Sequence, residues 1–246
     1  MLFARKIVFL LAHQDDEIFC LHLFHFFKNA HFTFIYLTDG ATGGKENIKI
    51  RRIKELEEAI NYIAPNSKVI QFGLLNNLED GKLALSMNKE KLDSLTEVIE
   101  NIGTDHLVSP FLEGGHQDHD AVFLITKYIA QSLNISQFSF PMYSAAILPF
   151  PFFKVMSKSE KHISFSVNFR ERVGFVRTTF KLMGIYKSQK NTWLILGIPV
   201  LLKYIFTKPI YFEDDDCNLS SVKKYLFETR GTFSKEAMTD LIRMLD

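Results

Sequence analysis

Five short apolar runs alternate with four segments of helical periodicity over the first 145 residues. The runs are rich in Val, Ile, Leu and Phe, and they cover Lys6–Ala12, Phe32–Thr38, Lys68–Phe72, His106–Phe111 and Gln137–Tyr143. The segments between them repeat apolar residues about every 3.6 positions, and they cover Glu17–Lys28, Glu46–Ile63, Asn88–Ile102 and His119–Leu133. Repeated strand and helix units produce parallel strands with right-handed crossovers and helices on both faces. The sequence therefore predicts an α/β fold with a Rossmann-like, mostly parallel, doubly wound sheet.

The alternation ends near Ala146, where prolines and phenylalanines become frequent. A β-like stretch, His162–Phe169, precedes a helical stretch, Arg170–Tyr186. We therefore expect residues 1–145 to form the catalytic core and residues 146–246 to form a smaller C-terminal cap at the edge of the sheet. The two parts are expected to form one structural unit.

Charge and cysteine content exclude some classes of protein. With 29 basic and 28 acidic residues, the chain lacks the basic excess that nucleic-acid binding requires. Cys20 and Cys217 are far apart and have no metal-type spacing, which indicates a reducing compartment. The first apolar run soon ends in charged residues and has no small-residue cleavage site, so it is typical of a strand and not of a signal peptide. We expect a cytoplasmic protein.

Histidines and carboxylates cluster directly after the first and fourth predicted strands, at 13–17 and 113–120. In a doubly wound sheet the binding site lies beyond the carboxyl ends of the strands, where the strand order reverses. If the fourth strand lies beside the first, the two loops meet. Adjacent buried carboxylates are costly unless a positive charge offsets them. Because zinc takes nitrogen and oxygen ligands, the two loops together predict a site for a divalent metal.

Each loop also has a simpler interpretation. His13 and Asp16 could form a capping cluster, since the helix dipole stabilises carboxylates at a helix N-terminus. His116 and His119 could mark an exposed helix start. The presence of both motifs, each after a predicted strand, favours the metal site.

The segments AHQDDE at 12–17 and GGHQDHD at 114–120 resemble the AHPDDE and HPDH signatures of the PIG-L/LmbE-like deacetylases. Smaller matches are LTDG at 37–40, RxxELxxA from Arg52, Asp80-Gly81 and Ser188-Gln189, so the resemblance spans residues 6–190. It implies a Rossmann-like fold and zinc-dependent hydrolysis of an N-acyl group, usually the acetyl of an N-acetylglucosamine-like sugar.

The resemblance also implies roles for individual residues. His13, Asp16 and His119 would hold zinc or another divalent ion, and Asp15 would be the general base that takes a proton from the attacking water. His116 would stabilise the oxyanion and assist departure of the amine. The remaining residues that it implicates are Asp118, which would orient His116, and the substrate contacts Asp39, Arg52, Asp80, Ser188 and Gln189. From the residues alone, Arg52 could equally be a solvated helix charge, and 188–189 an ordinary helix end.

Three positions depart from the family pattern. Gln14 and Gln117 replace the prolines of the two signatures, and Ala41 replaces a glutamate that often follows the second strand. Proline would fix φ in these loops, so its absence concerns loop geometry and not the ligands. Glu17 is expected to begin the following helix and to take no part in the chemistry.

The stretch 193–212, WLILGIPVLLKYIFTKPIYF, is the most apolar in the chain. Two prolines and two lysines interrupt it, so it lacks the uninterrupted apolar span of a transmembrane helix. It could form the core of the cap, a dimer surface, or a basic and aromatic surface that contacts a membrane peripherally.

These features predict a metal-dependent N-deacetylase that acts on the N-acetyl group of an amino sugar in glycan or glycoconjugate biosynthesis. The substrate would be a small molecule or a glycoconjugate. Two alternatives remain open at this point: a deacylase of a non-sugar amide, such as a thiol conjugate or antibiotic intermediate, and a non-catalytic sugar-binding module on the same scaffold.

Overall fold

The computed structural model describes residues 6–27, 29–41, 46–142, 162–206, 210–213 and 235–245. Its seven-stranded sheet has the order β3-β2-β1-β4-β5-β7-β6. The first five strands are mutually parallel, which confirms the predicted fold class. They are β1 (Lys6–Leu11), β2 (His31–Tyr36), β3 (Lys68–Ile70), β4 (His106–Pro110) and β5 (Ser136–Phe140).

Strand β1 lies at the centre of the sheet and pairs with both β2 and β4. Its side chains point alternately to the two faces, with Val8 and Leu10 in one core cluster and Ile7 and Phe9 in the other. Burial on both faces explains why the run is continuously apolar. The strand order reverses between β1 and β4, so the loops that follow these two strands meet in one crevice.

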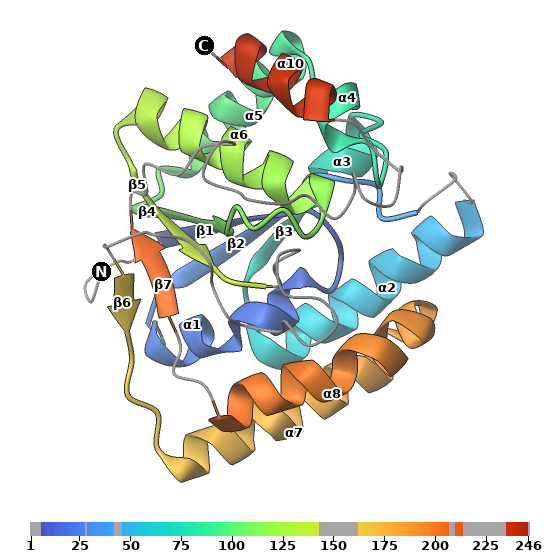
Figure 1. The fold of residues 1–246 in the computed structure, drawn as a ribbon, viewed down its shortest axis with the longest axis vertical. Coiled ribbons are helices and arrows are strands. Elements are labelled where there is room, and N and C mark those ends of the chain that lie inside the picture. The colour runs from blue at the N-terminus through green and yellow to red at the C-terminus, as the bar shows by residue number, and fades with distance from the viewer. Residues whose placement is uncertain are drawn as a thin grey trace.

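Helices cover both faces of the sheet (Figure 1). One layer contains α1 (Leu21–Phe26), α2 (Glu46–Ile63), α7 (Phe169–Ile185) and α8 (Lys190–Phe206). The other contains α4 (Leu83–Ser86), α5 (Lys89–Ile102), α6 (Gln117–Leu133) and α10 (Lys235–Leu245). The bounds of α2 are those predicted, and α5 and α6 begin close to the predicted positions. A short helix, α3 (Phe72–Leu75), which the sequence pattern did not predict, follows β3.

The predicted helix Glu17–Lys28 is wrong in form. The structure has a 3-10 helix, η1 (Asp16–Cys20), followed by the short α1. The hydroxyl of Tyr204 donates to the carbonyl of Ile18 and accepts the N–H of Leu21. A side chain from α8 thus satisfies backbone groups at the junction, which explains why one continuous helix does not form.

The C-terminal region contributes to the sheet and to both helical layers. β7 (Ile210–Glu213) pairs antiparallel with β5, and β6 (His162–Ser164) pairs with β7, so the predicted β-like stretch is shorter than expected. α7 and α8 contact each other, while α10 contacts α4 and α6.

The proposed boundary near residue 145 lies outside the described residues. Among the described helices, none has the length and apolar character needed to cross a membrane.

Gly73 allows α3 to contact the backbone that follows β2. A Cβ at this position would lie 2.5 Å from backbone atoms of Leu37 and Thr38. Gly73→Ala should therefore lower the free energy of unfolding, measured with urea, by about 3 kcal/mol. Gly174 on α7 is the matched control, because a Cβ there has no neighbour within 4 Å. Gly174→Ala should raise stability by about 0.5–1 kcal/mol, and equal effects of the two changes would contradict this packing argument.

Candidate metal centre

The loop after β1 is held by the side chain of Asp16. Its Oδ2 accepts the backbone N–H groups of Ala12 and His13, each at 2.9 Å. The N–H groups of Asp15 and Asp16 both donate to the carbonyl of His13. Asp15 has a φ of 148°, a strained conformation for a residue with a side chain. The loop is therefore fixed, and the second oxygen of Asp16 is directed toward His119.

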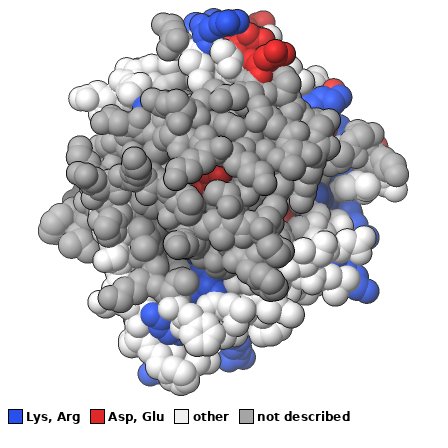
Figure 2. Space-filling view, in the orientation of Figure 1, with Lys and Arg blue, Asp and Glu red and all other residues white. Residues whose placement is uncertain are grey.

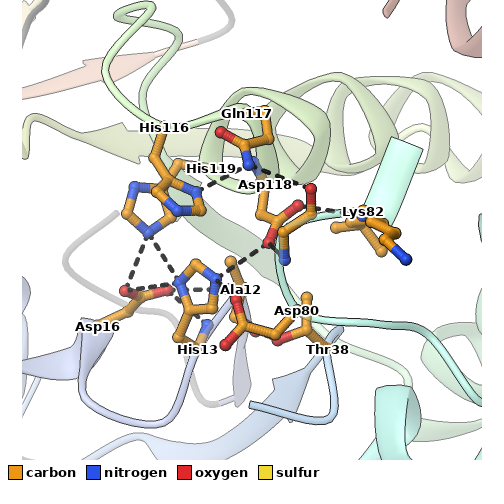
Figure 3. A network of polar contacts seen from close by, with 12 residues as sticks. Ala12, His13, Asp16, Thr38, Asp80, Lys82, His116, Gln117, Asp118 and His119 are labelled. Atoms are coloured by element: carbon orange, nitrogen blue, oxygen red, sulfur yellow. Dashed lines mark hydrogen bonds and ion pairs between the residues drawn. The ribbon is translucent and has the colours of Figure 1, made fainter. Parts of the chain in front are cut away.

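Three ligand atoms converge between this loop and α6 (Figure 3). His119 Nε2 lies 3.1 Å from Asp16 Oδ1 and 3.2 Å from His13 Nδ1. His13 Nδ1 and Asp16 Oδ1 are 3.8 Å apart. Tetrahedral ligands about 2.0–2.1 Å from zinc are separated by about 3.3–3.4 Å, so the three atoms fit such an ion. The residues predicted to hold the metal thus lie together in space.

The contacts of the other ring nitrogen of His13, Nε2, are those expected of a histidine that binds a metal through Nδ1. His13 Nε2 lies 3.1 Å from Asp118 Oδ2 and 3.2 Å from Asp80 Oδ1. A histidine that binds a metal usually donates its other ring N–H to a carboxylate, which fixes the orientation of the ring. Asp118 is itself held in place, since it accepts the backbone N–H groups of Gly81 at 2.6 Å and Leu83 at 3.0 Å.

Two further groups of donor atoms lie within 4.8 Å of one another: His13, His116 and His119, and His13, Asp80 and Asp118. Both include His13. In the second group, the oxygens of Asp118 already accept backbone hydrogen bonds. In the predicted set His13, Asp16 and His119, the aspartate oxygen that faces His119 is Asp16 Oδ1, while Asp16 Oδ2 accepts the backbone hydrogen bonds.

Electrostatics separate the two adjacent aspartates. Burial would raise the pKa of Asp16, but the facing His119 and His13 hold it below its usual range. Burial and the charge of Asp16 raise the pKa of Asp15 well above its usual value, while Arg52 and His13 oppose the rise. Environments that move two neighbouring carboxyl groups in opposite directions are typical of an acid–base site.

His116 precedes α6 and caps it. Its Nδ1 accepts the backbone N–H of Asp118 at 3.2 Å. Burial, followed by the charges of His13 and His119, lowers the pKa of His116 to about 3. The ring is therefore neutral near pH 7 and carries its proton on Nε2. Asp118 contacts His116 as a neighbour through its backbone N–H, while its carboxylate contacts His13.

A pocket of about 200 Å³ opens at this cluster. Eight of the residues that line it were predicted from the sequence as site residues: His13, Asp15, Asp16, Arg52, Asp80, His116, His119 and Gln189. Five further lining residues were not predicted: Phe19, Met142, Thr192, Trp193 and Leu196. Three of these lie on α8, whose sequence shows only an apolar stretch. No local motif marked these residues as part of a site.

Asp39 and Ser188 do not line this pocket. Asp39 Oδ1 accepts the N–H of Asp80 at 3.1 Å, and its Oδ2 lies 2.8 Å from Lys49 Nζ. The hydroxyl and N–H of Ser188 both donate to Glu55 on α2. The contacts of Asp39 therefore position Asp80, and those of Ser188 hold the segment that carries Gln189. Of the predicted substrate contacts, Arg52, Asp80 and Gln189 line the pocket, and these two residues lie outside its lining.

The two glutamines that replace prolines form hydrogen bonds between loops. Gln14 is buried, and its Nε2 donates to Gln71 Oε1 at 3.1 Å. It packs against Gly40, whose φ of 66° and close approach to the Gln14 side chain both favour glycine. Gln117 Nε2 donates to the carbonyl of Gly81 at 3.1 Å. Both signature loops are thus tied to the segment after β3.

Glu17 is fully buried, and burial raises its pKa to about 7. It is the second residue of η1, and it accepts hydrogen bonds from the hydroxyls of Tyr36 and Tyr186. Tyr186 directly follows α7. Glu17 therefore links the aspartate loop to the helical layer that carries α8.

Residues 8–130 match the family model of the GlcNAc-PI de-N-acetylases, PIG-L, and the chain belongs to this family of deacetylases. Two similar solved structures are deacetylases of teicoplanin biosynthesis. One is a deacetylase–bog complex, and the other is the zinc-inhibited form of teicoplanin deacetylase Orf2. Each is 12% identical to this chain, with a TM-score of 0.59. Each comparison covers 85% of this chain and 97% of the other. Dbv21, an A40926 pseudoaglycone deacetylase, is 13% identical, with a TM-score of 0.54. This comparison covers 84% of this chain and 95% of Dbv21. These similarities confirm the fold. No curated protein matches the chain.

Proposed function

We propose that this deacetylase hydrolyses the N-acetyl group of an amino sugar with the help of a zinc ion held by His13, Asp16 and His119. The observation that supports this proposal is that the three ligand atoms lie within 3.8 Å of one another in the same pocket as Asp15 and His116. Zinc in such a position lowers the pKa of a water and polarises an amide carbonyl.

Asp15 is the proposed general base. Its carboxylate lies in the pocket beside Asp16 but takes no part in the three-atom ligand set. It is therefore free to take the proton of the attacking water and to pass that proton to the departing amine. Arg52, on the pocket wall, supports the ionised form of Asp15, since its charge lowers the carboxyl pKa.

His116 is the proposed oxyanion donor. Because its Nδ1 accepts a backbone N–H, the neutral ring presents an Nε2–H. The ring lies against His13, with 4.8 Å between ring centroids, so this donor is next to the ligand set. A fixed N–H group near the developing negative charge stabilises the tetrahedral transition state.

The remainder of the pocket suits a sugar. Arg52 Nε makes no hydrogen bond to the described residues, and neither does the indole Nε1 of Trp193. Both residues line the pocket, so these two buried N–H groups are the proposed donors to hydroxyl groups of a substrate. Phe19 and Trp193, with ring centroids 6.3 Å apart, form an apolar wall that could pack against the carbon face of a sugar ring.

A substrate panel tests this assignment. Zinc-loaded protein should release acetate from a β-glycoside of N-acetylglucosamine at a higher kcat/KM than from N-acetylcysteine or an N-acetylated amino acid amide. Trp193→Phe keeps the aromatic wall but removes the indole N–H, and it should raise KM for the sugar more than it lowers kcat. Preference for a non-sugar amide would transfer the proposal to that substrate class, and zinc-loaded protein without activity on any of them would contradict deacetylation.

A further inference from the structure

Helix α8 is apolar on both its inner and its outer face. Its inner face contributes buried Trp193, Val200 and Tyr204 to the core. Its outer face carries large apolar side chains at three- and four-residue intervals, and these are Leu194, Ile195, Ile198, Leu202, Ile205 and Phe206. Leu194, Ile195 and Phe206 are each at least 70% exposed. A helix that is apolar all round is normally enclosed, so this outer face is missing a partner within the described structure.

The neighbouring helix α7 extends the apolar face. Phe169, Val173 and Phe180 are exposed and share one side of α7, because they lie at i, i+4 and i+11. α7 and α8 run side by side in Figure 1 and contact each other. We call the exposed apolar residues of these two helices the α7–α8 face.

The segment that carries the α7–α8 face is rich in basic residues, of which Lys181 and Lys187 line a pocket between α7 and α2 that also contains Glu55 and Glu58. Residues 169–206 contain seven Lys or Arg and one acidic residue, Glu171, although the whole chain is nearly neutral. Glu171 is paired with His25. Five of the basic residues are exposed: Arg170, Arg177, Lys181, Lys187 and Lys190. In Figure 2 the lower part of the molecule, where α7 and α8 lie in Figure 1, shows white and blue atoms.

We propose that the α7–α8 face docks on the surface of a lipid bilayer that contains anionic lipids. Exposed apolar side chains would enter the boundary between headgroups and acyl chains, and the exposed lysines and arginines of this segment would contact lipid phosphates. A second copy of the chain suits this face less well, because a symmetric contact would place two basic segments against each other. The same helix supplies Trp193 and Leu196 to the pocket, so the bilayer would lie against the helix that forms the pocket wall.

Vesicle co-sedimentation tests the proposal without any substrate, so its result is independent of the proposed activity. The protein should sediment with phosphatidylcholine vesicles that contain roughly one-third phosphatidylserine, and less with pure phosphatidylcholine, as the basic segment requires. Ile198→Gln with Leu202→Gln should weaken the binding at least roughly tenfold. Lys181→Gln and Lys187→Gln should each weaken it about fivefold at low salt.

Leu85→Gln is the matched control, since Leu85 is 63% exposed on α4 in the other helical layer. This variant should bind vesicles like the unchanged protein. The proposal is overturned if the unchanged protein does not bind anionic vesicles, or if the Ile198 and Leu202 variant binds as well as the control. Sedimentation velocity gives a third contrary result: a dimer that this variant converts to a monomer would assign the face to a second copy of the chain.

Discussion

Asp15→Asn is expected to lower kcat for an N-acetylated amino sugar by roughly 10²–10⁴-fold, which is the usual contribution of a positioned base. The amide cannot take the proton of the attacking water. Zinc content should remain near one ion per chain, because Asp15 takes no part in the three-atom ligand set. Asparagine also tolerates positive φ better than most residues, so the loop should keep its conformation at a φ of 148°.

The control for this change is Asp93→Asn, which makes the same replacement at an exposed position on α5. It should leave kcat and zinc content unchanged. Initial rates and metal analysis on the same samples separate the outcomes. If the Asp15 variant turns over normally, the base has been assigned to the wrong residue; if it loses zinc, Asp15 belongs to the ligand set.

His119→Ala should remove both the metal and the activity. His119 Nε2 lies within 3.2 Å of both other ligand atoms, so its loss leaves an incomplete site. Changes outside the ligand set commonly weaken metal binding 10–100-fold, and loss of a ligand should weaken it by more than roughly 100-fold. Competition with a chromogenic chelator measures the zinc affinity, and acetate release measures the activity.

The matched control is His31→Ala, at an exposed position at the start of β2. This variant should bind zinc and release acetate as the unchanged protein does. Because alanine favours helix, the first turn of α6 should remain folded in the His119 variant. Full zinc affinity in that variant would show that another donor set, such as His13, Asp80 and Asp118, holds the ion.

The sheet could be predicted from sequence because its strands are buried on both faces. Continuous apolar runs such as Ile7–Leu11 stand out against the periodic helices between them. The position of the site then follows from topology, since the loops after β1 and β4 must meet where the strand order reverses. These two rules place His13, Asp16 and His119, the ligands that the family resemblance implies, in one crevice.

The wall of the pocket could not be predicted in the same way. Phe19 and Trp193 come together only when α8 packs into the core cluster that contains both residues, and neither belongs to a local motif. The same holds for Glu17, whose partner Tyr186 is 169 residues away. Contacts of such high sequence separation leave no periodic signal in the chain.

The carboxylate of Asp118 makes a contact that the sequence did not predict. Asp118 was expected to orient His116, two positions earlier, and its backbone N–H does contact the His116 ring. Its carboxylate contacts His13 from another loop. The two glutamines at the proline positions are similar, because their partners Gln71 and Gly81 both lie near β3. Their function as links between loops depends on the fold and not on the motif.

A zinc titration of metal-free protein tests the central claim most directly. Acetate release from an N-acetylglucosamine glycoside is measured as zinc is added in steps below one equivalent. We predict that the rate rises in proportion to bound zinc and reaches its maximum near one ion per chain, and that Asp15→Asn binds the same zinc without releasing acetate. A rate that does not depend on zinc, or no acetate from fully loaded protein, would contradict the assignment of this site as a metal-dependent deacetylase.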